Sequence, residues 1–125
     1  MRFMSRFFVP SIVILLLTGQ QSILAQTDVE ADPAHHNLLF ENEHVRVVRA
    51  VFGAGEKSTA PFDGKDVVVV RVKGSGPITI NIPYGAPITA DSMEPGEAVW
   101  APAGRIQPEN RTDQRLEFIV IEPKH

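Results

Sequence analysis

Turn-forming residues divide this chain into short segments, and that division limits the folds open to it. The 125 residues include ten prolines and nine glycines, which separate short apolar stretches. None of these stretches keeps the i, i+3, i+4 spacing of an amphipathic helix over a helical length. Short strands joined by frequent turns are typical of an all-β sandwich or barrel, which is the predicted fold class.

Alternation and β-branched composition indicate where the strands lie. Residues 45–52 and 78–82 alternate between two faces, as half-buried strands do. Four valines in a row, Val67–Val70, show no alternation and therefore predict a strand that is covered on both faces. Residues 56–66 are expected to form an irregular polar loop. Further strands are expected at residues 88–93, 98–100 and 116–121, and residues 38–40 form a short apolar run.

The first part of the chain predicts export. Arg2 and Arg6 flank the start of an apolar run over residues 7–17, and Ala25 offers a small residue for cleavage, as in a secretory signal peptide. The run is shorter than the roughly 20 residues of a membrane span, so no span is expected after cleavage. We expect a periplasmic or extracellular protein with a signal peptide over 1–25, a flexible leader over 26–36 and a β-barrel domain over 37–125.

Charge and cysteine content argue against several classes of protein. After cleavage, ten basic residues face fifteen acidic ones, which gives a net charge of −5 with neutral histidines. A nucleic-acid partner, which would need a basic face, is therefore not expected. The chain has no cysteine, so the core must stabilise an exported form without disulfides. Neither a Ser/His/Asp or Cys/His set nor a phosphate-binding loop can be assembled from the sequence.

Four stretches occur in an order and at a spacing that resemble a known superfamily. They are Phe40–Val47, Gly55–Lys57, Val67–Val70 and Gly96–Asn110. With them the chain resembles a small single-domain cupin of the exported bacterial type, over nearly its whole length from about Asp32. The resemblance implies a double-stranded β-helix, a jelly-roll-like barrel, and usually a homodimer.

The resemblance also implies where a metal would lie. Many cupins hold one through two histidines of an H-x-H element, a nearby Glu and a third His. By position these fall on Pro61 and Asp63, on Asp66 or Val67, and on Ile106 or Gln107, and none of them is histidine. A transition metal needs three or four imidazole, thiolate or carboxylate donors. We expect a degenerate site with no transition metal and no other cofactor; two carboxylates and an amide would hold at most a weak Ca²⁺.

Four residues are candidate ligand contacts at the barrel mouth: Asp63, Trp100, Gln107 and Arg49. Asp63 and Gln107 could orient a polar ligand, and the single tryptophan could form the floor of a pocket. An arginine that points inward, Arg49 or Arg71, would need a carboxylate partner such as Asp63 or Glu109. Each of these residues also has a purely structural interpretation, as a turn, core or surface residue.

The histidines are not expected to carry chemistry. His35 and His36 are adjacent, and neighbours in an extended segment point to opposite sides, so they rarely bind one ion together. His44 follows Asn42 and Glu43 in a polar turn. His125 is the C-terminal residue.

These observations favour a non-enzymatic barrel that binds a small ligand or a partner protein without the usual transition metal. One alternative is a cupin-type enzyme, isomerase-like or lyase-like, that uses Asp63, Asp66 or an inward arginine for acid–base chemistry, or an atypical metal site. Another is a structural dimeric subunit whose barrel is filled by side chains. A filled barrel would contain no pocket of about 300 Å³ or more.

Overall fold

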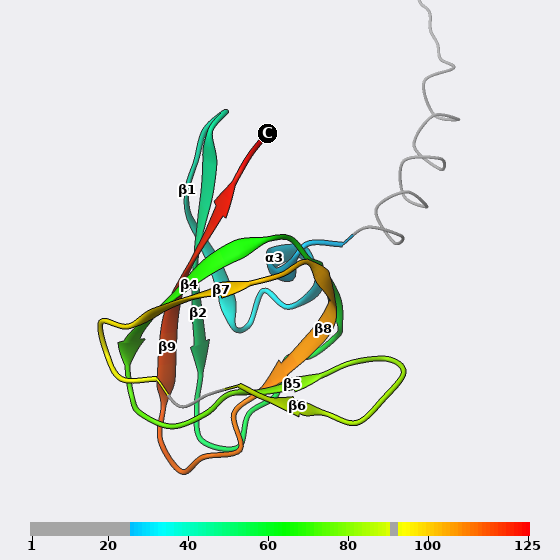
Figure 1. Ribbon diagram of the computed structural model, residues 1–125, viewed down its shortest axis with the longest axis vertical. Coiled ribbons are helices and arrows are strands. Elements are labelled where there is room, and N and C mark those ends of the chain that lie inside the picture. The colour runs from blue at the N-terminus through cyan, green and yellow to red at the C-terminus, as the bar shows by residue number, and fades with distance from the viewer. Residues whose placement is uncertain (1–25, 91–92) are drawn as a thin grey trace, which may run out of the picture.

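The computed structural model describes residues 26–90 and 93–125, which form two antiparallel sheets facing each other (Figure 1). The larger sheet has the strand order β1-β2-β9-β4-β7, and the smaller sheet has the order β3-β8-β5-β6. A single-turn helix, α3 (Asp28–Ala31), precedes them. The strands are β1 (His36–Glu41), β2 (Val45–Phe52), β3 (Phe62–Gly64), β4 (Val67–Lys73), β5 (Thr79–Asn81), β6 (Ile88–Thr89), β7 (Ala98–Ala101), β8 (Gly104–Glu109) and β9 (Leu116–Pro123).

The larger sheet supplies most of the core. In β2 the alternation predicted from the sequence places Val48, Ala50 and Phe52 in the interior, and each is at most 4% exposed. Strand β9 lies between β2 and β4, and its Phe118 pairs with Ala50 on one side. Ala50, Phe52, Leu116 and Phe118 form one buried cluster, against which three further apolar side chains pack: Val69, Ile78 and Val120.

The predicted all-β class is confirmed, and it includes strands that were not predicted from the sequence. Strand β3 lies inside the stretch expected to be an irregular loop, and β8 follows the Pro102–Gly104 break. Strand β8 pairs with both β3 and β5 although Pro108 lies within it. The Pro108 carbonyl accepts a hydrogen bond from the Ser58 backbone N–H at 2.9 Å, so the segment is held despite the missing proline donor.

The chain before the barrel divides into a part that the structure describes and a part that it does not. The predicted signal peptide, residues 1–25, lies outside the described residues. Residues 26–36, expected to be a flexible leader, instead contain helix α3, whose Thr27 and Glu30 form a reciprocal capping box. Asp32 ends the helix and is fully buried. No helix among the described residues is long and apolar enough to cross a membrane.

Candidate functional site

A cavity of about 320 Å³ lies between the two sheets. Both sheets contribute to it through side chains that alternation turns inward, because residues i and i+2 of a strand share a face. Val67 and Val69 of β4 therefore line it, whereas Val68 and Val70 do not. Apolar side chains from other strands complete most of the wall, among them Phe52, Phe62, Ile80, Ile106, Phe118 and Val120.

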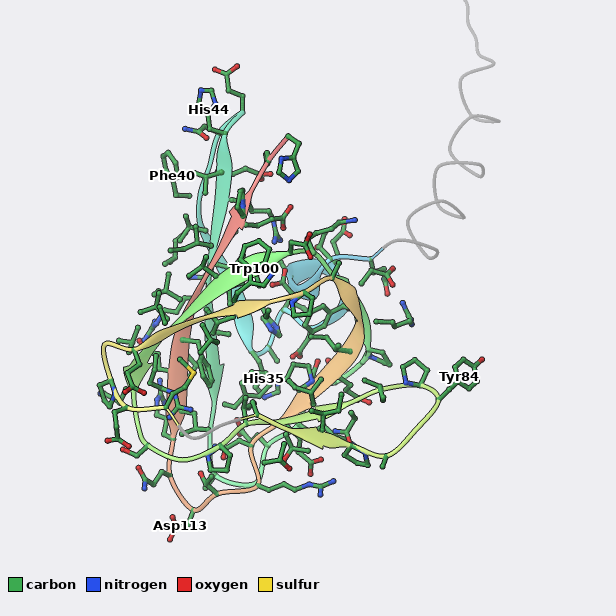
Figure 2. The ribbon with its side chains drawn as sticks, viewed as in Figure 1. His35, Phe40, His44, Tyr84, Trp100 and Asp113 are labelled. Atoms are coloured by element: carbon green, nitrogen blue, oxygen red, sulfur yellow. The ribbon has the colours of Figure 1, made fainter. Side chains whose placement is uncertain are left out.

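Three side chains with a polar atom stand out on this wall: His36, Lys65 and Trp100. Lys65 is exposed, and Trp100 of β7 is 59% exposed, so both lie at the rim of the cavity. His36 is only 5% exposed and therefore belongs to the interior. In Figure 2 Trp100 lies on β7 at the edge of the barrel, and Tyr84 points away from it at the tip of the β5–β6 loop.

The buried carboxylate of Asp32 connects helix α3, the first strand and the loop before β3. His35 Nδ1 donates to both Asp32 oxygens, at 3.0 and 2.9 Å, and Thr59 Oγ1 donates to Oδ1 at 2.8 Å. His36 Nδ1 lies 3.3 Å from Oδ2. Burial raises the pKa of Asp32, but the hydrogen bonds from Thr59 and His35 outweigh it and leave that pKa below its ordinary value. The carboxylate is thus held ionised in the interior.

The two histidines have different surroundings although they are adjacent. The His35 ring stacks on Phe52 at a centroid distance of 4.7 Å, and its Nε2 lies 3.3 Å from a carboxylate oxygen of Glu56. The His36 ring instead meets Phe52 and Phe62 edge-on, at 5.6 and 5.2 Å. His36 pairs with Ala50 across β1 and β2, and both side chains line the cavity, which His35 does not.

Asp63, expected at the barrel mouth, does not line the cavity. Its Oδ1 accepts a hydrogen bond from Arg105 Nη1 at 3.0 Å, between neighbouring positions on β3 and β8. It lies instead in a second cavity of about 190 Å³, which Asp28 and Arg46 also line. Asp63 Oδ2 is buried and has no hydrogen-bond partner among the described residues.

The other predicted site residues are scattered. Gln107 donates from Nε2 to the Ser58 carbonyl at 2.7 Å, and it does not line the cavity. Arg49 donates from Nε to Glu117 Oε2 at 2.8 Å, and the hydrogen bond and charge of Glu117 raise the pKa of that arginine. Of the four predicted residues, the structure therefore places Trp100 alone at the cavity and does not bring the set together.

Arg71 is the arginine that is buried, and its partners are not the carboxylates expected from the sequence. It is 1% exposed, and its guanidinium donates to the carbonyls of Gly74 at 2.8 Å and Gly76 at 2.6 Å. The same group lies 4.7 Å from the centre of the Phe118 ring. Burial lowers the pKa of Arg71 from its ordinary value. Its two terminal nitrogens thus hold the β4–β5 turn through backbone carbonyls, its Nε has no partner among the described residues, and Arg71 does not line the cavity.

The positions that the resemblance assigns to a metal site are engaged in other contacts or carry no donor atom. Asp63 is paired with Arg105, and Asp66 Oδ1 accepts a hydrogen bond from the Ala103 backbone N–H at 2.7 Å. Gln107 is engaged with Ser58, and Ile106 has no donor atom. Within residues 26–90 and 93–125 no group of three His, Asp or Glu side chains is arranged to hold a metal ion.

Comparison with solved structures identifies the fold. The chain matches the crystal structure of a cupin domain from Bordetella pertussis Tohama I with a TM-score of 0.63 and 26% identity, over 72% of this chain and 92% of that one. The chain has the cupin double-stranded β-helix fold. A cupin family protein from Methanocaldococcus jannaschii matches with a TM-score of 0.54 and 22% identity, over 72% and 79% of the two chains.

Structures of proteins described as enzymes also match, at lower identity. The polyketide cyclase RemF from Streptomyces resistomycificus is 18% identical, with a TM-score of 0.52 over 72% of this chain and 64% of that one. Likeness at this level shows the fold alone, since one fold carries many activities. No family model matches the sequence, and neither does any curated protein.

Sequence reasoning did not find the Asp32–His36 pair. The signal was present as an aspartate followed at the third and fourth positions by histidine. The argument that adjacent side chains point to opposite sides holds within a strand, but His35 belongs to the turn before β1 and His36 is its first residue. Both Nδ1 atoms consequently lie next to the same carboxylate.

Proposed function

We propose that this cupin-fold protein binds a small, mainly apolar molecule inside its barrel, without a transition metal. The observation that carries the proposal is the cavity of about 320 Å³ with its largely apolar wall. Pockets that bind small molecules begin at roughly 300 Å³. An apolar cavity of about 150 Å³ is already enough to bind benzene. A molecule of one or two rings therefore suits this interior in size and in polarity.

Two alternatives are less well supported. A structural subunit with a filled barrel would lack a cavity of this volume. An enzyme that uses Asp63 or Asp66 for acid–base chemistry would need those carboxylates at the ligand, whereas they are bonded to Arg105 and to the Ala103 N–H. Export and a homodimeric state stay predictions that the proposal does not require.

The test is a titration with p-xylene, a neutral apolar molecule with one ring. Trp100 is the single tryptophan and lies at the cavity rim, so its fluorescence should change as the cavity fills. We expect saturable binding of one p-xylene per chain. Replacing Val69, which lines the cavity, by Phe should weaken binding at least about tenfold, because the added ring occupies the space of the ligand.

Val70→Phe is the matched control, since Val70 neighbours Val69 on β4 but does not line the cavity. It should bind p-xylene within about twofold of the unchanged protein. Absence of saturable binding to the unchanged protein would contradict the proposal. If Val69→Phe and Val70→Phe weakened p-xylene binding equally, the binding site would not be the cavity between the sheets.

A further inference from the structure

His36 can supply the cavity with a strong hydrogen-bond acceptor, which no other side chain on its wall offers. Among the side chains that line the cavity, Lys65 and Trp100 can only donate, and the others are apolar. An imidazole with one protonated nitrogen offers a strong acceptor on the other. The question is therefore which His36 nitrogen carries the hydrogen.

The partners of His36 Nδ1 answer that question. Nδ1 lies 3.1 Å from the Asp32 backbone carbonyl oxygen and 3.3 Å from Asp32 Oδ2. Neither a carbonyl oxygen nor an ionised carboxylate can donate, so Nδ1 must carry the hydrogen and donate it. The lone pair of the neutral ring is then on Nε2, on the side of the ring that points away from Asp32.

The His36 ring is fixed in this orientation. It is 5% exposed and is in edge contact with Phe52 and Phe62. Nε2 makes no hydrogen bond to any described residue, and it is absent from the fully enclosed polar atoms without a partner, which are Asp63 Oδ2 and Arg71 Nε. Because His36 lines the cavity and its Nδ1 faces Asp32, Nε2 is the ring nitrogen available to the cavity.

We propose that His36 Nε2 is the polar anchor of the binding site, and that the ligand is a neutral apolar molecule bearing one hydroxyl group. The hydroxyl donates to Nε2 while the rest of the molecule contacts the apolar wall. A carboxylate has no hydrogen to donate, and a charged ammonium group would lose its hydration in an apolar cavity. A phenol has the required shape and donor. This inference rests on the proposed function and narrows its ligand class.

A pair of ligands of almost equal shape tests the anchor. p-Cresol differs from p-xylene by a hydroxyl group in place of one methyl group. The quantity to measure is the ratio of the p-cresol affinity to the p-xylene affinity, by calorimetry, for the protein and its variants. His36→Phe keeps a ring but removes the acceptor, so we expect it to lower this ratio about two- to tenfold. Comparing ratios cancels effects that are common to both ligands.

His35→Phe is the matched control. It also removes a histidine bonded to Asp32, but from a residue that does not line the cavity. We expect it to leave the ratio unchanged. If the two variants lower the ratio equally, the effect comes from Asp32 and the anchor is overturned. If the ratio stays the same in His36→Phe while both ligands still bind, the anchor is overturned and the proposed function stands.

Failure of both ligands to bind the unchanged protein would instead overturn the proposed function, and the anchor with it. A second measurement needs no substitution. In the ¹⁵N spectrum of the histidine side chains, p-cresol should shift the Nε2 resonance of His36, and p-xylene should leave it nearly in place because it offers no donor. Equal shifts with the two ligands would overturn the anchor.

Discussion

Polar side chains cluster in two regions, on strands β3 and β8 and at the turn between α3 and β1, and the two clusters differ in their relation to the cavity. On β3 and β8, Asp63 is paired with Arg105, and Gln107 is bonded to the Ser58 carbonyl. At the turn between α3 and β1, the Asp32 carboxylate accepts hydrogen bonds from His35 and Thr59. His36 lines the cavity, and its Nε2 is the proposed anchor. The positions at which the cupin resemblance implied ligands thus hold the fold together. The polar group of the cavity, His36, lies before Phe40–Val47, the first of the four stretches on which the resemblance rests.

The two regions also differ in how far their charges are buried. The Asp32 side chain is fully buried, whereas the side chains of Asp63 and Arg105 are 30% and 42% exposed. Removing a buried carboxylate lowers the stability of the fold strongly, because it leaves unpaired donors in the interior. An exposed ion pair contributes less, because water screens it.

The largest effect is expected from Asp32→Ala. The substitution removes the carboxylate that lies next to Nδ1 of His35 and of His36. It also removes the acceptor of the Thr59 hydroxyl. We expect the free energy of unfolding to fall by about 3 kcal/mol. Urea denaturation followed by circular dichroism measures it. A loss below about 1 kcal/mol would contradict this prediction, because it would be no larger than the loss expected for an exposed ion pair.

An intermediate effect is expected in the acid stability of the protein. Because the folded-state pKa of Asp32 lies below its ordinary value, its contribution is present above about pH 4 and is lost as the pH falls through the lower folded pKa. The pKa values of Glu109 and Glu117 are also lowered, so their contributions to the stability of the protein are likewise lost as the pH falls. Asp32→Asn should therefore flatten the fall in unfolding free energy between about pH 5 and pH 2 without abolishing it. An unchanged slope would contradict the role given to the Asp32 charge.

The smallest effect is expected from Asp63→Ala. It removes a partly exposed ion pair, so the free energy of unfolding should change by less than about 1 kcal/mol. The affinity for p-xylene should stay within about twofold, because Asp63 does not line the cavity. Calorimetry with this variant measures both. A loss of binding of tenfold or more would return Asp63 to the ligand site and break the comparison between the two regions.

Most of the fold could be predicted because its signals are local. Alternation in residues 45–52 and the valine run at Val67–Val70 define two strands of the larger sheet whatever the rest of the chain does. Strands β3 and β8 could not be found in this way. The first has three residues, and the second contains Gly104 and Pro108, which normally argue against a strand. Their pairing with each other places them in the sheet.

The site was less predictable because it depends on contacts between distant segments. Thr59 and Asp32 are far apart in the sequence, and their hydrogen bond brings the loop before β3 against α3. Asp63 was expected in a loop, whereas it lies in β3 beside Arg105 of β8, a pairing that no local sequence signal indicates. Trp100 was found because a single aromatic on a strand is a recognisable signal. His36 was not found, because its direction is set by the turn before it.

The most direct test of the account is a crystal structure of the protein grown with p-cresol. We predict one cresol between the two sheets, its ring against Phe52, Phe62 and Phe118 and its hydroxyl within hydrogen-bond distance of His36 Nε2, about 2.6–3.2 Å. Asp63 should still be paired with Arg105. A cresol bound next to Asp63 and Gln107, or a barrel interior closed by side chains with no room for the ligand, would contradict the account.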